Sequence, residues 1–137
     1  MTQNSATAIL PYSVEIIMQR IIDAENLPKW NPAFSDVGPV NEKGEYPITV
    51  QKLLRGTMSY TQFREVDSNS QTIELEIKIP GLSEQSEFIL EPMGQRTKVT
   101  HHIIQTGPLT AVIGASEAAA VPNKRLTRLK QILDGTY

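Results

Sequence analysis

The chain contains no cysteine, which excludes disulfide bonds, thiolate zinc sites and cysteine nucleophiles. It also lacks a long apolar run, because no window approaches the roughly 20 apolar residues that a membrane-spanning helix needs. The opening segment, residues 1–12, has neither the basic start nor the apolar stretch of a signal peptide. We therefore expect a soluble, cytoplasmic protein with no membrane span.

Positive and negative residues are nearly balanced, with 13 Lys and Arg against 15 Asp and Glu. The formal net charge is −2, so no strong field would attract nucleic acid, and we expect no nucleic-acid partner. The two histidines, His101 and His102, are neighbours in a segment with strand character and would point to opposite faces, so they could not hold a metal ion together. With no cysteine and no third histidine, we expect no metal site. Because the glycines form no phosphate-binding loop, we expect no cofactor either.

What the sequence does contain is enough apolar material for one core. Its 137 residues are 39% hydrophobic, and no repeat, low-complexity stretch or linker divides them. We therefore expect a single domain that covers residues 1–137.

An early helix is indicated by apolar residues at three- and four-residue spacing after Ser13. Ser13 is a favourable N-cap, and Glu15 follows it in the first turn, where a negative charge suits the helix dipole. We expect the helix to cover residues 14–27 and to end before Pro28, because the proline ring disfavours continuation.

From Phe34 to about Gln105 the apolar period changes to two, with turn residues between the segments. About six strands are predicted there, and Ala6–Leu10 is a candidate for one more. The clearest five segments are residues 46–54, 57–66, 72–79, 83–91 and 96–105. Their short connections predict antiparallel hairpins in one sheet that buries a single face.

Helical spacing returns at Leu109 and continues to Leu133. Pro122 predicts a kink or a break near Val121, and Gly135 is a plausible C-cap. The predicted class is therefore α+β, with a curved antiparallel sheet of six or seven strands wrapped around a long C-terminal helix.

Three segments carry a resemblance to a known family: DAENLPKWNPAFSDV after the early helix, the GQRTKVTHHI strand, and the closing RLTRLKQIL helix. With this element order, the chain resembles the START-like, Bet v 1-like superfamily (SRPBCC) of the polyketide cyclase/dehydrase type, which has a helix-grip fold. The resemblance implies a cavity between the sheet and the C-terminal helix. It also implies a small hydrophobic ligand of lipid, polyketide or aromatic type, but no common catalytic motif.

Polar residues interrupt the apolar face of two predicted strands. Gln62 and Arg64 share their parity with Met58 and Tyr60, and Lys52 shares its parity with neighbouring apolar residues. If they face inward, they indicate a wet or ligand-filled cavity, in which Arg64 could hold a carboxylate. Alternatively, each lies near a strand end and reaches solvent.

Two further residues have a functional interpretation beside a structural one. We favour His101 over His102 as the inward histidine, where it could exchange protons as the candidate catalytic residue or simply fill the core. Trp30, the only tryptophan, could close the mouth of the cavity or pack the helix end onto the sheet. The basic residues Lys124, Arg125, Arg128 and Lys130 are interpreted as a solvent-exposed helix face.

The leading hypothesis is a binding protein for a small, largely hydrophobic molecule. The predicted lining consists of Trp30, Tyr46, Tyr60, Gln62, Arg64, Leu75, Ile77, Phe88, His101, Ile113 and Leu129. The alternatives are a cyclase, dehydrase or isomerase that uses His101, and a protein-interaction module with a filled core. The sequence leaves the oligomeric state open between a monomer and a homodimer.

Overall fold

The computed structural model describes residues 1–65 and 70–135, and within these residues one antiparallel sheet of seven strands frames the molecule. The side chains of residues 62–65 lie outside the described part. The strands are β1 (Thr2–Leu10), β2 (Asp36–Val37), β3 (Tyr46–Val50), β4 (Leu54–Glu65), β5 (Gln71–Ile79), β6 (Leu82–Met93) and β7 (Arg96–Thr106). The helices are α1 (Val14–Ile21), the 3₁₀ helix η1 (Ala24–Lys29), α2 (Leu109–Ile113) and α3 (Ala115–Asp134).

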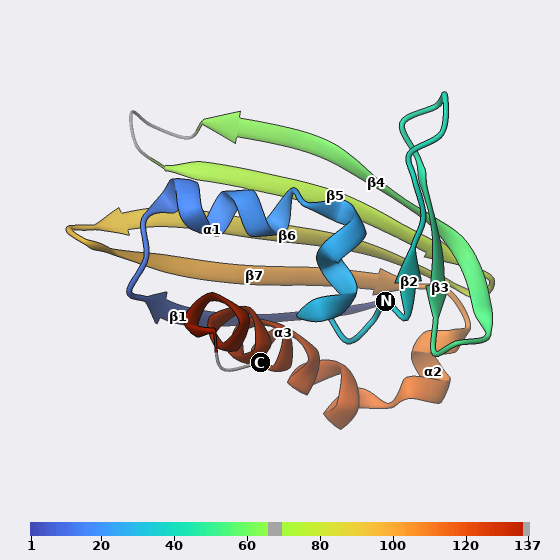
Figure 1. Ribbon diagram of the computed structural model, residues 1–137. Helices are drawn as coiled ribbons and strands as arrows, with labels where there is room; N and C mark the ends of the chain where they lie inside the picture. Colours follow the sequence, from blue (N-terminus) through green and yellow to red (C-terminus); the bar gives the residue numbers. More distant parts are fainter. Residues whose placement is uncertain (66–69, 136–137) are drawn as a thin grey trace.

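The strand order is β1-β7-β6-β5-β4-β3-β2, so the chain's first strand joins its last and both lie at one side of the sheet. Strands β3 to β7 form a meander, and the sheet curves around the helices (Figure 1). The prediction of an α+β fold with a curved sheet and a long C-terminal helix is confirmed. Strand β1 begins at Thr2, before the predicted Ala6, because it pairs with β7 along its whole length.

The N-terminal helix is shorter than predicted. Ser13 is its N-cap as expected, and the Ser13 hydroxyl accepts a hydrogen bond of 3.3 Å from the backbone N–H of Ile16. However, α1 ends at Ile21, and Pro28 lies inside η1. A hydrogen bond of 2.8 Å between the Asn26 and Asp23 side chains holds this second segment as a tighter turn.

The predicted strand over residues 46–54 is in fact a hairpin turn and parts of two strands. Strand β3 ends at Val50, and Gln51 and Lys52 both have a left-handed backbone, with φ of 53° and 63°. Lys52 is consequently exposed at the turn, so of the two alternatives for Lys52 the structure supports the one in which it reaches solvent. Sequence reasoning missed this turn because glycine or asparagine usually occupies such positions.

The break in the C-terminal helix lies at Gly114, not near Val121. Gly114 has a φ of 83°, which no helix interior accepts, and it separates α2 from α3. Helix α3 is continuous through Pro122, which is buried and removes one backbone donor. Gly135 ends α3 with a left-handed backbone, as predicted.

The core lies between the concave face of the sheet and the helices. Strand β5 contributes Ile73, Leu75 and Ile77, while α1 contributes Ile17 and Ile21. Helix α3 closes the core with Leu126 and Leu129, neither of which is more than 1% exposed. The helices therefore cover one face of the sheet, as Figure 1 shows for α1 and α3.

Candidate functional site

A cleft of about 510 Å³ opens at the end of the sheet where β3 turns into β4 and β5 into β6. We call it the α2 cleft, because α2 and the start of α3 form its other wall. Its polar lining residues are Gln51 and Glu117. Its apolar lining residues are Val50, Leu54, Ile79, Leu82, Leu109, Val112 and Ile113.

Helix α2 is held in place by the turn between β5 and β6. The backbone N–H of Leu109 donates a hydrogen bond of 3.0 Å to the carbonyl oxygen of Gly81. Gly107 lies so close to this turn that a β-carbon on it would be 2.4 Å from the same oxygen. A glycine is therefore required at position 107 for the wall of the α2 cleft to form.

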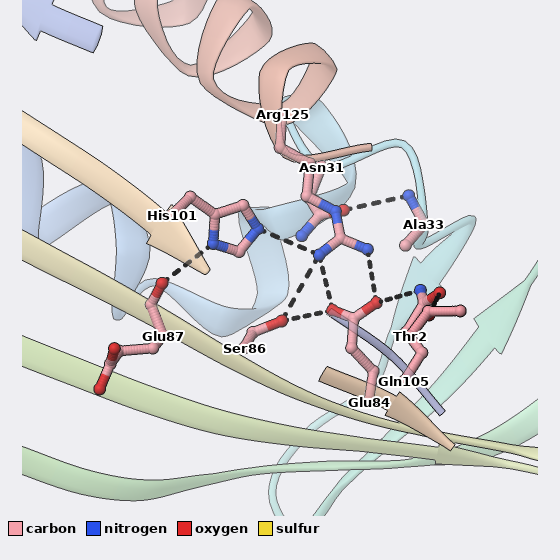
Figure 2. A network of polar contacts seen from close by, with 9 residues as sticks. All are labelled: Thr2, Asn31, Ala33, Glu84, Ser86, Glu87, His101, Gln105 and Arg125. Carbon is pink, nitrogen blue, oxygen red and sulfur yellow. Dashed lines mark hydrogen bonds and ion pairs between the residues drawn. The ribbon is translucent and has the colours of Figure 1, made fainter. Parts of the chain in front are cut away.

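A buried ion pair lies inside the fold, between β6 and α3 (Figure 2). Nη1 and Nη2 of Arg125 donate to the two carboxylate oxygens of Glu84 at 2.6 Å and 3.0 Å. Both side chains are only 3% exposed. The interpretation of Arg125 as part of a solvent-exposed helix face is therefore wrong, because its guanidinium has a charged partner that the sequence pattern did not reveal.

The remaining hydrogen-bonding capacity of the Glu84 carboxylate is taken by two neighbours. Gln105 donates from Nε2 at 2.9 Å, and the Ser86 hydroxyl also donates to Glu84. Burial alone would raise the pKa of Glu84, but the Arg125 charge and these hydrogen bonds outweigh it and lower the pKa to about 2. Glu84 is therefore a charged, fully bonded carboxylate in the interior.

His101 points into the interior beside this pair, as favoured from the sequence. Its ring stacks on Phe88 with centroids 4.0 Å apart. Nδ1 lies 3.1 Å from the carbonyl oxygen of Glu87, and Nε2 lies 3.2 Å from Nη1 of Arg125. Since a carbonyl only accepts and a guanidinium only donates, Nδ1 carries the proton and Nε2 accepts. Burial, followed by the nearby Arg125 charge, lowers the pKa of His101 to about 3.

Glu84 of the ion pair lies two residues further along β6 than Leu82, which lines the α2 cleft. Ile79 and Leu82 face each other across β5 and β6 and line the cleft. The next pair on the same face is Ile77 and Glu84. Two residues along a strand correspond to roughly 7 Å, so the Glu84 backbone lies about that far from the cleft wall.

The described residues that were predicted to line one cavity lie in three different places in the structure. Ile113 lines the α2 cleft, and His101 lies beside the ion pair. The residues in or packed against the hydrophobic core are Trp30, Tyr46, Tyr60, Leu75, Ile77, Phe88 and Leu129. The predictions for Gln62 and Arg64 fall on side chains outside the described part. The backbone register shifts between Tyr60 and Gln62, so the parity that linked these residues is interrupted.

Aromatic contacts explain why the predicted tyrosines and Trp30 are core residues. The ring of Tyr46 packs edge-to-face on Tyr60, whose hydroxyl donates a 2.6 Å hydrogen bond to the carbonyl of Ile21. Trp30 is 1% exposed and packs edge-to-face on Phe88 at 5.8 Å. These rings tie the α1–η1 segment to the sheet.

The unusual state of His101 predicts a stability that depends on pH. The folded-state pKa of about 3 is below the unfolded value of 6.5, so below pH 6.5 the unfolded chain binds a proton that the folded chain does not. The free energy of unfolding should therefore fall by about 2 kcal/mol between pH 7 and pH 5. Urea unfolding at these pH values measures it. In His101→Phe most of this decrease should disappear, and an unchanged decrease would contradict the assignment.

Comparisons with solved structures identify the type of fold. No protein-family model matches the sequence, and the search of curated proteins found no match. Among solved structures, a START superfamily protein from Mycobacterium smegmatis has a TM-score of 0.69 at 17% identity, over 97% of this chain and 94% of the other. The chain has a START-like fold.

Two further structures share this START-like fold. A STAR-related lipid transfer protein from Xanthomonas axonopodis has a TM-score of 0.71 at 11% identity, covering 95% of this chain and 84% of the other. A conserved protein from Geobacillus kaustophilus has a TM-score of 0.76 at 13% identity, covering 98% and 97%. At such low identity the likeness concerns architecture, so function must be argued from the site.

Two observations concern the described residues as a whole. No helix within residues 1–65 and 70–135 is both long and apolar enough to cross a membrane. In the same part of the chain, no cluster of three or more histidine or acidic side chains is placed to hold a metal ion.

Proposed function

We propose that the protein binds a small, largely apolar molecule in the α2 cleft. The observation that carries the proposal is the lining, in which apolar side chains from two hairpin turns and from α2 border a cleft of about 510 Å³. That volume is within the range of small-molecule sites, which are mostly apolar with a few polar groups. Gln51 and Glu117 are the polar groups available to orient such a ligand.

The START-like fold supports a ligand of this kind. One solved structure with the same fold is a STAR-related lipid transfer protein, and its name describes the transfer of lipids. The α2 cleft differs from the deeper cavity expected from the sequence, because Leu75, Ile77 and Leu129 pack together there. We therefore place the ligand at the end of the sheet, against Ile113 and Leu82.

A binding role agrees better with the geometry than the enzymatic alternative does. That alternative relied on His101 as a proton-transfer group. His101 is 0% exposed, both ring nitrogens are engaged, and its lowered pKa keeps the ring neutral near pH 7. No observation in the described site favours a cyclase or dehydrase, so we propose binding alone.

A cleft-filling substitution tests the proposed function. Native protein should enhance the fluorescence of the uncharged apolar probe N-phenyl-1-naphthylamine. In Ile113→Trp the larger ring should occupy the α2 cleft and raise the Kd at least about tenfold, which is about 1.4 kcal/mol. Ile113 is half-buried, so the fold should tolerate the change.

The matched control is Val40→Trp, because Val40 is an exposed apolar residue that does not line the cleft. This variant should bind the probe like the native protein. The proposal fails if the native protein does not bind the probe, or if Ile113→Trp binds it with unchanged affinity.

A further inference from the structure

The two edges of the sheet are protected very differently. At one edge, β2 has two residues, one of them the charged Asp36, and Gly38 and Pro39 follow it directly. A short, charged strand followed by proline is a common means of preventing edge-to-edge association. At the other edge, β1 is nine residues long and contains neither a charged residue nor a proline. Strand β1 therefore lacks the charge and the proline that protect β2, and α3 is the helix that packs against it.

Strand β1 is also regular enough to accept another strand. It pairs residue by residue with β7, from Thr2 opposite Gln105 to Leu10 opposite Thr97, without a bulge. In the sheet of the described residues it is the terminal strand, so its other side has no neighbouring strand (Figure 1). The backbone N–H and C=O groups that point to that side can template an added strand.

The two faces of β1 differ in their exposure. Ala6 and Ala8 face inward and pack against the core, where α3 also contacts the strand. Ser5 and Thr7 lie on the outer face and are exposed, as is Ile9 at 47%. The strand therefore carries no charged side chain that would repel a second strand placed beside it.

The absence of charged residues in β1 removes one obstacle to pairing with a second copy of the same strand. When two identical strands pair antiparallel around a two-fold axis, residues near the axis face the same residue of the other copy. A charge there would face a like charge, which destabilises the pair. The other long strands, β4 to β7, all contain charged residues, whereas β1 contains none.

We propose that the protein forms a homodimer in which the β1 edges of two copies pair antiparallel and join the two sheets. This inference is independent of the ligand, because the α2 cleft is formed by other elements. A nine-residue edge buries a small interface, so the dimer should be in concentration-dependent equilibrium with a Kd on the order of 1–100 µM.

Sedimentation velocity of the full chain tests the proposal. The mass should rise with concentration from 15.2 kDa toward twice that value. In Ser5→Lys and in Thr7→Lys, like charges meet near the axis, and the dimer Kd should rise at least about tenfold. The control is Gln85→Lys, the same kind of change at an exposed position on the interior strand β6, which should leave the Kd unchanged.

Introduced cysteines provide a second readout that does not depend on the lysine variants folding. The chain has no cysteine, so one new thiol can only link to its own copy. Mild oxidation should yield covalent dimers of Ser5→Cys or Thr7→Cys but not of Gln85→Cys. A mass of 15.2 kDa at all concentrations would overturn the proposal. So would a dimer whose Kd the lysines do not change, or cross-linking no greater at β1 than at position 85.

Discussion

Replacement of Arg125 by methionine should lower the free energy of unfolding by about 3–5 kcal/mol, because it leaves the Glu84 carboxylate buried without its counter-charge. Glu84 is only 3% exposed and cannot recover the lost interaction from water. Unfolding in urea, followed by circular dichroism, measures the difference. The control is Lys124→Met on the exposed side of the same helix, which should change stability by no more than about 0.5 kcal/mol.

A paired substitution distinguishes the missing partner from the missing side chain. In Glu84→Leu with Arg125→Met both charges are removed together, and most of the lost stability should return. Nε of Arg125 is buried and has no hydrogen-bond partner among the described residues, so the native pair itself has a cost that the apolar pair avoids. If the double variant were as unstable as Arg125→Met alone, the uncompensated charge would not be the cause.

Replacement of Trp30 by alanine should cost about 3–5 kcal/mol, the usual range for removing a large ring from a packed core. Trp30 is 1% exposed and contacts Phe88, which in turn stacks on His101. A residue that only closed a cavity mouth would cost much less stability and would alter ligand binding instead. Circular dichroism in urea measures the loss without relying on tryptophan fluorescence.

Trp30→Phe is the matched variant for this prediction. It keeps an aromatic ring against Phe88, and no hydrogen bond is lost because Nε1 of Trp30 has no partner among the described residues. The loss should therefore be clearly smaller than in Trp30→Ala. Equal losses in the two variants would indicate that ring packing is not what Trp30 contributes.

Helix caps and strand alternation were predicted correctly where the residues of one short segment are sufficient to specify the element. Ser13 and Gly135 cap their helices as expected, and the alternation over residues 72–79 corresponds to β5. The errors occurred where a positive backbone φ interrupts an element. Gln51 and Lys52 form a left-handed turn without glycine. The helix break was assigned to Pro122, whereas it lies at Gly114 and α3 continues through Pro122.

The candidate site was harder to predict because it depends on contacts between distant segments. Glu84 and Arg125 are 41 positions apart. A signal for each was present, since Glu84 shares the strand parity of Phe88, and Arg125 lies four positions before Leu129 on the apolar side of α3. Each residue alone resembles a surface charge, and only together do they indicate a buried pair.

The Glu84–Arg125 pair also constrains how the sequence can change over evolution. A protein of this size has a total stability of about 5–15 kcal/mol, so a single replacement that costs about 3–5 kcal/mol removes much of the reserve. Sequences that lose one charge would therefore tend to be eliminated before the second charge could change. Among relatives with this fold, we expect positions 84 and 125 to vary together, either as a charged pair or as an apolar pair.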